Sequence, residues 1–459
     1  MDLKEIFRLS PEFTDYSELR AQKNNRVNLG MINGSITSNV KNEISGISAR
    51  VYHRGSWGFA SDSDINLRTI KSVVQSADRN AHYLAKRNQG KDVLLASRPV
   101  KVDKDFSTRK KRLEQKFLIE YIRELDHLIK SSYPGLKART LMLNCLDMEK
   151  ALLTSDGSEA YTLIPRSLLY IILSTEKDGK PIELFQDYGG FGNFEENFSD
   201  PTDLREKINL QYEHLMHKKD GIYPDSGLKE CILDADLAGI LSHEAIGHTT
   251  EADIVLGGSV AADYLEKQVA SPQVSMVDFA HHYHDELCPV PVFADDEGTQ
   301  AEDVVIIDNG ILKGFMHNKE TANHFNAGLT GNARAFSYHD EPLIRMRNTA
   351  ILPGNDNLAE MIASIDNGYY LIKSGNGQAD STSEFMFGIT LGYEIIKGKL
   401  GRAILDTTIS GVAFDMLKSV TMISNDMSWN CSGMCGKKQN IPVGMGGPAV
   451  KCKVNIGGK

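Results

Sequence analysis

Long apolar runs, a cysteine framework and an excess of basic charge are all missing from this chain of 459 residues. No apolar stretch reaches roughly 18 residues, which excludes a membrane-spanning helix of ordinary length. The formal net charge of −10 leaves no general basic surface for nucleic acid. The six cysteines have no C-x-x-C spacing, so no disulfide scaffold is expected; they stand at positions 145, 231, 288, 431, 435 and 452.

The N-terminal segment Met1–Asn28 is polar and charged, and it has no apolar core typical of a secretory signal. Hydrophobic residues make up 41% of the chain and charged residues 24%, as in globular proteins. The length allows two or three domains with cores of their own. We therefore expect a cytoplasmic protein, in which a reduced cysteine is available to bind a metal.

Apolar spacing predicts mixed α and β structure in the first half of the chain. Residues 26–60 favour short antiparallel strands, and helical spacing follows over 67–81 and 113–129. Turn signals at Asp156-Gly157 and Asp178-Gly179 predict hairpins. The strands expected around these turns are 138–147, 150–154, 160–164, 168–175 and 182–187. Apolar residues from Leu204 to Leu215 then indicate a helix that opens near Pro201.

The segment 223–227, Tyr-Pro-Asp-Ser-Gly, is the best candidate for a domain boundary. We predict an N-terminal α+β domain over 1–224, which could divide into lobes at 1–100 and 101–224, and a C-terminal domain over 225–459. In the second domain, an apolar strand near 230–234 precedes a nearly all-apolar helix that begins around Leu237. Short strands and glycine turns from about residue 290 favour a curled sheet or barrel. The predicted fold is α+β, with a buried metal-site helix in the strand-rich domain.

The segment His243-Glu244-Ala245-Ile246-Gly247-His248 has the residue types of a hydrolytic metal site. Neutral imidazoles bind Zn²⁺, and a carboxylate that does not bind the ion can take a proton from an activated water. The histidines are five residues apart, which places them about 140° apart on a regular helix. Both can reach one ion only if the helix is distorted or ends between them. Gly247 could allow such a bulge or exit.

Two histidines hold zinc poorly, so a third protein ligand is expected. Glu251 lies three residues after His248, whereas Cys435 lies in a glycine-flanked segment far along the chain, four residues after Cys431. A lone cysteine is usually a small buried hydrophobe. From these patterns Glu251 and Cys435 are equal candidates.

The sequence resembles the TldD/PmbA family, and within it the metal-bearing TldD-type subunit. The resemblance covers most of the chain. It is carried by the segments 46–51, 57–60, 243–248 with Glu251 and Asp253, 295–299, 309–314, 331–334, 345–349, 375–380, 435–437, 442–444 and 457–458.

That resemblance implies a zinc peptidase for small, extended or unfolded peptides. It implies His243, His248 and Cys435 as metal ligands and Glu244 as the general base. It also implies a particle of two subunits, either a homodimer or a heterodimer with a PmbA-type chain. Glu251 and Asp253 are then expected to orient imidazole N–H groups. The family's older name, modulator of DNA gyrase, does not imply direct DNA binding by this acidic chain.

Some features depart from the family pattern. Thr249-Thr250 replaces the usual glycine and apolar pair after the second histidine, and the stretch 254–292 diverges. The divergent stretch contains His281, His282 and His284, which we interpret as exposed loop histidines rather than as a second metal site. Tyr338 and His339 are candidate oxyanion donors, by the family match around Arg334.

Two functions without catalysis stay open at this point. One is a peptide-binding or scaffold subunit whose zinc is structural or absent. The other is a partner protein that acts on a topoisomerase by binding alone. Soft sulfur with imidazole suits zinc but does not exclude other metals.

Overall fold

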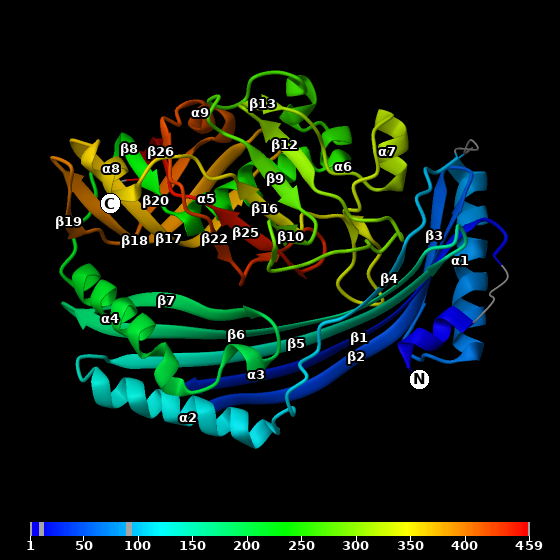
Figure 1. Cartoon of the computed structure of the whole chain (residues 1–459), viewed down its shortest axis with the longest axis horizontal. Helices are drawn as coiled ribbons and strands as arrows, with labels where there is room; N and C mark the ends of the chain where they lie inside the picture. Colours follow the sequence, from blue (N-terminus) through cyan, green and yellow to red (C-terminus); the bar gives the residue numbers. More distant parts are fainter. Residues whose placement is uncertain (1, 9–12, 89–93, 458–459) are drawn as a thin grey trace.

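Long antiparallel strands dominate the N-terminal half of the computed structural model, which describes residues 2–8, 13–88 and 94–457 (Figure 1). Gly458, from the last segment of the family resemblance, lies outside these residues. Strands β1 (Tyr16–Ile32) and β2 (Ser35–His53) pair along their whole length across a tight turn at Asn33 and Gly34. The expected short strands over 26–60 belong to these two strands of 17 and 19 residues and to the start of β3 (Ser56–Asp62). Uninterrupted backbone pairing makes β1 and β2 longer than expected.

One sheet contains all seven of these N-terminal strands, in the order β3-β2-β1-β5-β6-β4 with β7 also on β6. The further members are β3 (Ser56–Asp62), β4 (Lys101–Asp105), β5 (Ala138–Thr154), β6 (Glu159–Lys177) and β7 (Lys180–Phe191). The hairpin turns predicted at Asp156-Gly157 and Asp178-Gly179 are confirmed, since they join β5 to β6 and β6 to β7. Strands from 1–100 and from 101–224 share this sheet.

The predicted helices of the first half are present and pack on the sheet. They are α1 (Leu67–Asn88), α2 (Gln115–Ser132) and α4 (Arg205–Lys219). Helix α1 buries Ile70, Val73 and Ala77 against strands β2 and β3. Helix α2 buries Leu118, Ile122, Leu125 and Ile129 with residues of β5 and β6. Removing these apolar stripes from water stabilises both contacts.

Five strands of the C-terminal half close into a barrel, as the pattern of short strands predicted. The circle runs β17-β8-β26-β20-β18 and back to β17. Its strands are β8 (Gly227–Leu233), β17 (Asn367–Ala379), β18 (Glu384–Ile396), β20 (Thr407–Val412) and β26 (Val450–Ile456), with β19 (Lys399–Ala403) and β21 (Met422–Ile423) attached. Closure leaves these five strands few free edges.

A second, mixed sheet lies beside the barrel. Its order is β13-β12-β9-β16-β25-β22. The strands are β9 (Met276–Phe279), β12 (Val304–Asp308), β13 (Ile311–Leu312), β16 (Asn348–Ile351), β22 (Ser428–Asn430) and β25 (Gly444–Gly447). Helix α5 (Ala235–Leu241) packs between this sheet and β17. Gly239 lets the helix approach, because a Cβ there would lie 2.9 Å from the backbone nitrogen of Gly446.

Shorter elements account for most of the remaining described residues. They are η1 (Leu3–Arg8), α3 (Phe194–Asn197), η2 (Pro201–Leu204), α6 (Ala252–Leu256), η5 (Val260–Tyr264), β10 (His282–Tyr283), β11 (Glu286–Leu287), α7 (Lys319–Phe325), β14 (Ala333–Arg334), β15 (Leu343–Ile344), α8 (Leu358–Ala363), α9 (Ala413–Lys418), β23 (Met434–Cys435) and β24 (Ile441–Pro442). The predicted boundary segment 223–227 lies between α4 and the body of β8. Within the described residues, no helix is long and apolar enough to cross a membrane.

Buried ion pairs join the N-terminal sheet to the C-terminal half. Lys319 Nζ lies 2.8 Å from Asp156, and Lys150 Nζ lies 2.7 Å from Asp296. Arg50 pairs with Glu18 of its own sheet and reaches across to Glu297 at 2.5 Å. Charges removed from water at a contact must be paired there, so these residues define how the two halves dock.

Candidate metal centre

Helix α5 leads directly into the His-Glu-x-x-x-His segment. Its N-cap is Asp234, whose side chain accepts a hydrogen bond from the backbone N–H of Ala235. From Ser242 to Gly247 the chain continues as a π-helical turn, labelled η3, and from His248 to Thr250 as a 3₁₀ turn, η4. The expected helix distortion between the two histidines is therefore present.

The π turn accounts for the unusual five-residue spacing. The backbone N–H of His248 donates to the carbonyl oxygen of His243, which is the i to i+5 bond that defines such a turn. A wider turn returns residue i+5 to nearly the same side of the helix as residue i. The two imidazole centroids are consequently 5.1 Å apart, with their planes at 79°.

Gly247 serves this turn through its size and not through an unusual conformation. Its φ of −57° and ψ of −53° are ordinary helical values, so the backbone freedom suggested by the sequence is not used. A Cβ at this position would collide with the Sδ atom of Met346. Glycine is therefore needed here for close packing.

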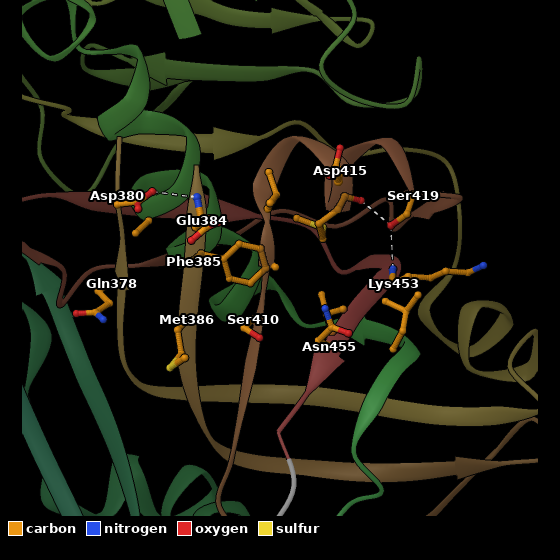
Figure 2. Close-up of a pocket in the computed structure, with 16 residues that line it drawn as sticks. Gln378, Asp380, Glu384, Phe385, Met386, Ser410, Asp415, Ser419, Lys453 and Asn455 are labelled. Atoms are coloured by element: carbon orange, nitrogen blue, oxygen red, sulfur yellow. Dashed lines mark hydrogen bonds between the residues drawn. The ribbon is translucent and has the colours of Figure 1, made fainter. Parts of the chain in front are cut away.

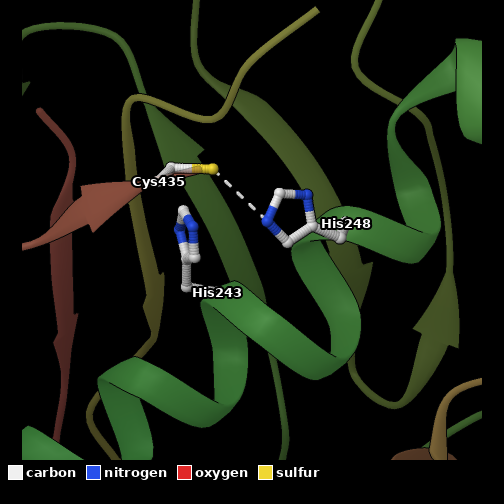
Figure 3. Close-up of side chains that lie close together, drawn as sticks. All are labelled: His243, His248 and Cys435. Atoms are coloured by element: carbon white, nitrogen blue, oxygen red, sulfur yellow. Dashed lines mark hydrogen bonds between the residues drawn. The ribbon is translucent and has the colours of Figure 1, made fainter. Parts of the chain in front are cut away.

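Three potential metal-ligand side chains converge at the π turn (Figure 3). One ligand atom from each of His243, His248 and Cys435 lies within 4.8 Å of the other two. Cys435, on β23, faces the two rings, and its Sγ lies 3.3 Å from His248 Nε2. His243 is 1% exposed, and neither of its ring nitrogens has a hydrogen-bond partner in the described structure.

This arrangement fits a tetrahedral zinc ion. With ordinary Zn–S and Zn–N bond lengths, a sulfur and a nitrogen on one such ion lie about 3.5 Å apart, close to the separation found here. A buried imidazole with two unpartnered nitrogens is costly unless something binds it. Two imidazoles and a thiolate are also a donor set that zinc favours.

The charges within this cluster favour a thiolate. Burial alone would raise the pKa of the Cys435 thiol, but interactions with His243 and His248 lower it to about 3. Burial lowers the pKa of His248, whereas Glu251 and Cys435 raise it to about 10. The thiolate is the form of cysteine that binds metals, so Cys435 is prepared for that role.

A buried carboxylate holds the ring of His248. Glu251 is 0% exposed, and its Oε2 lies 3.0 Å from His248 Nδ1, which leaves Nε2 directed at Cys435. Lys437 Nζ lies 3.1 Å from the same Glu251 oxygen and 2.7 Å from Asp253. Glu251 thus has the predicted orienting position, whereas Asp253 pairs with a lysine and does not contact an imidazole. Ligating histidines normally have such an outer partner.

Glu244 lies beside the three side chains without being one of them. Its Oε2 is 3.8 Å from His248 Nε2, and its side chain is partly exposed. A carboxylate in that position can reach water or a substrate at the same centre, which a general base must do.

Two basic residues, Arg345 and Lys437, fix the position of the segment around Cys435. Arg345 is fully buried and donates to the backbone carbonyls of Cys435, Lys437 and Gln439. Lys437 also donates to the carbonyl of Ile344. Both residues fall within segments of the family resemblance, but only the fold reveals what they contact.

Other residues singled out from the sequence have different hydrogen-bond partners from the cluster. In the described chain, no hydrogen bond joins Tyr338 or His339 to Glu244 or to the three ligand candidates; His339 contacts Ser337 instead. His281 Nδ1 lies 2.6 Å from His282 Nδ1, and the His281 ring stacks on Phe293. His281 and His282 are partly buried, and the three loop histidines form no three-ligand group among the described residues.

The structure also has open cavities away from these side chains. Figure 2 shows one of about 870 Å³ lined by β18, β20, β26 and α9, with Phe385, Ser410 and Asn455 among its walls. No residue of the candidate centre lines it. A second cavity, of about 610 Å³, lies between the N-terminal sheet and the start of α5. Lys373 stands there between Asp187 and Asp236, at 3.1 and 3.5 Å.

Comparison with known proteins gives matches over both halves of the chain. Residues 226–458 match the PmbA/TldA metallopeptidase C-terminal domain, and residues 17–81 match domain 1 of the same metallopeptidases. A metalloprotease of Methanocaldococcus jannaschii is 29% identical over 98% of each chain. A zinc metalloprotease TldD homolog of Saccharolobus solfataricus is 29% identical over 90% of each chain. The crystal structure of TldE from Thermococcus kodakarensis has the same fold, with a TM-score of 0.75 at 16% identity over 97% of both chains.

Proposed function

The chain belongs to the PmbA/TldD metallopeptidase family, and from that premise we propose that it is a zinc-dependent peptidase. In this proposal His243, His248 and Cys435 hold Zn²⁺, and Glu244 is the general base. The observation that carries it is that one ligand atom from each of His243, His248 and Cys435 lies close to the other two. In addition, neither ring nitrogen of the buried His243 has a hydrogen-bond partner in the described structure.

The residues of the chain have separate tasks in this mechanism. When bound, zinc would polarise the scissile carbonyl and lower the pKa of a water molecule toward neutrality. The Glu244 carboxylate takes a proton from the attacking water and returns it to the leaving amine. Glu251 keeps the His248 ring in place by holding its Nδ1–H. A thiolate ligand would make a bound ion a weaker Lewis acid than three histidines would, so we expect modest turnover.

The proposed substrates are small or unfolded peptides. The cavity between the N-terminal sheet and the start of α5 has side chains of both signs, from Asp187, Asp236 and Lys373. None of the four residues of the candidate centre lines this cavity, and Lys373 is already paired with both carboxylates, so the substrate proposal rests on the centre itself. His243 and Cys435 are each 1% exposed, so a small or unfolded peptide, whose backbone is accessible, is a better fit than a folded protein.

The proposed assembly has two subunits, either two copies of this chain or this chain with a PmbA-type partner. Support comes from the outer part of β2. Residues 35–43 of β2 are exposed, and they include Ile36 and Val40. β3 pairs with β2 only from Ile47 onward, so the edge before it can pair with another chain. Measuring the mass in solution, alone and with a PmbA-type chain, tests this assembly.

The central experiment compares zinc content and cleavage of an unfolded peptide, with and without a chelator. Glu244→Gln should keep its zinc and lose about 10²–10⁴-fold in rate, because only the proton transfer is removed. Cys435→Ala should lose both zinc and activity. Cys431→Ala is the matched control, because this cysteine lies outside the cluster, and it should retain both properties.

Other outcomes would change the assignment. Normal cleavage by Glu244→Gln would rule out this base. Unaltered zinc affinity in Cys435→Ala would make Glu251 the better third ligand. A zinc-loaded wild-type chain that binds unfolded peptides but never cleaves them would be a scaffold or binding subunit instead.

A further inference from the structure

A second group of potential metal ligands lies in the N-terminal sheet region, on elements remote in sequence from the π turn. Its members are Asp15, just before β1, His53, at the end of β2, and His82, on α1. One ligand atom from each lies within 4.8 Å of the other two. The family resemblance and the proposed peptidase chemistry assign these three side chains no role.

The three side chains share one oxygen atom as their centre. Asp15 Oδ2 lies 2.9 Å from His53 Nδ1 and 3.8 Å from His82 Nε2. The imidazole rings stack face to face, with centroids 3.8 Å apart and planes at 19°. A nitrogen of each ring lies near the same carboxylate oxygen, and because imidazole lone pairs lie in the ring planes, the rings would tilt out of this stack to share one ion. Two nitrogens and an oxygen bound to one ion at ordinary lengths would be about 3–3.5 Å apart, which these separations bracket.

The hydrogen bond that His82 makes on its own helix leaves Nε2, the ring nitrogen nearer Asp15, available to bind a metal. Its Nδ1 lies 3.0 Å from the backbone carbonyl oxygen of Asp78, one helical turn earlier, so Nδ1 carries the proton. Nε2 is then an unprotonated donor atom that faces Asp15. A backbone carbonyl behind one nitrogen is the usual way in which a ligating histidine is oriented. The Asp78 side chain is itself held by the Thr14 hydroxyl at 2.8 Å.

An ordinary ion pair accounts for only part of this geometry. The contact between His53 and Asp15 is a normal hydrogen bond, but the second imidazole gains little from a carboxylate 3.8 Å away. Two stacked rings would repel each other if both were protonated. A cation between the carboxylate and two neutral imidazoles removes that difficulty, because all three donor atoms then face a positive charge.

We propose that Asp15, His53 and His82 form a second site for a divalent transition-metal ion of the zinc class. Two imidazoles and one carboxylate suit such ions better than calcium or magnesium, which prefer oxygen ligands alone. The side chains are 31%, 22% and 43% exposed, so water can complete the coordination. The ion would tie the start of β1, the end of β2 and helix α1 together, which is a structural role.

The test is the zinc content of the full-length chain after dialysis against buffered free zinc. His53→Gln and His82→Gln should each bind one equivalent less than the wild type. Asp15→Asn keeps a side chain of the same size and should weaken the same equivalent at least tenfold. His127→Gln is the matched control, since this exposed histidine on α2 lies outside the group, and it should bind as the wild type does.

Cobalt substitution separates this site from the cysteine centre. Sulfur-to-cobalt charge transfer reports Cys435, and it should be unchanged in His53→Gln and His82→Gln. If Cys435 did not bind metal, the wild type would lack that band. The wild type would still bind one equivalent of metal more than His82→Gln. Equal metal content in wild type, His53→Gln and His82→Gln would overturn the second site. So would an equal loss in His127→Gln.

Discussion

The backbone N–H of His248 donates to the carbonyl oxygen of His243, five residues earlier in the chain. On a regular helix, residues five apart would point about 140° away from each other. The π turn that this bond closes brings both imidazoles to one side of the helix. The Met346 side chain packs directly against Gly247 within this turn and leaves no room for a Cβ there. The candidate centre therefore depends on close packing around the turn as well as on the ligands.

Gly247→Ala should disturb the π turn, because the added methyl group would displace the Met346 side chain. Overpacking of this kind costs about 1–3 kcal/mol of unfolding free energy. We also expect weaker zinc binding, since the two rings would no longer share one side of the turn. Urea denaturation and zinc titration measure the two effects. Gly257→Ala, at the C-cap of α6 where a Cβ meets no atom closer than 3.3 Å, is the comparison and should change both less.

Lys437→Met should weaken zinc binding although Lys437 is not a ligand. Without this cation the buried Glu251 carboxylate loses its charged partner at 3.1 Å and is held less firmly against His248 Nδ1. Loss of such an outer partner typically costs about 10–100-fold in metal affinity. Competition with a chromophoric chelator measures it. Lys438→Met, which removes an exposed neighbouring charge, should leave the affinity unchanged; similar losses in both variants would contradict this role.

Stability should fall at acid pH partly because of His317. Burial lowers the pKa of this imidazole to about 4 in the folded chain. Above a pH of about 6.5 both states are neutral at this position and the full stability is present. As the pH falls toward 4, only the unfolded chain takes up the proton, so folding loses about 1.4 kcal/mol per pH unit, or about 3 kcal/mol in all.

Replacing His317 tests this linkage through a difference between two pH values. The drop in unfolding free energy between about pH 7 and pH 4 should be smaller in His317→Gln than in the wild type. The exposed His127 is again the control, and His127→Gln should follow the wild-type profile. A His317→Gln profile parallel to that of the wild type would show that this histidine does not contribute.

Two lysine–carboxylate pairs of similar length should differ greatly in importance. Lys319 lies 2.8 Å from Asp156 and is 0% exposed, whereas Lys313 lies 2.7 Å from Glu266 and is 39% exposed. Lys319→Met leaves a carboxylate unpaired at the contact between the two halves and should cost about 3–5 kcal/mol. Lys313→Met should cost at most about 1 kcal/mol. Chemical denaturation of both variants gives the comparison, and equal costs would contradict it.

Much of the secondary structure was predictable because it depends on local patterns. The helical spacing over 113–129 and the turns at Asp156-Gly157 and Asp178-Gly179 are encoded within a few residues. The buried face differs in part from that spacing, because Leu113 and Phe117 are exposed while Leu118 and Ile122 are buried. The lengths of β1 and β2 were not predictable in this way. Pairing along the whole of a neighbouring strand carries each one through polar stretches that look like loops when the sequence is considered alone.

For the candidate centre, the sequence by itself determined the set of side chains: two imidazoles and a carboxylate between them. It also determined the five-residue spacing that required a distorted helix. Spacing alone left Glu251 and Cys435 as equal candidates, since it carries no information about a side chain 187 positions away; the family resemblance was what favoured Cys435. Only the tertiary structure decided which of them faces the histidines. Arg345 donates a hydrogen bond to the backbone carbonyl of Cys435, whose side chain faces the π turn. Lys437 forms an ion pair with Glu251, which contacts His248 Nδ1. Which atoms meet across such a distance depends on the packing of the whole chain, because no local interaction specifies it.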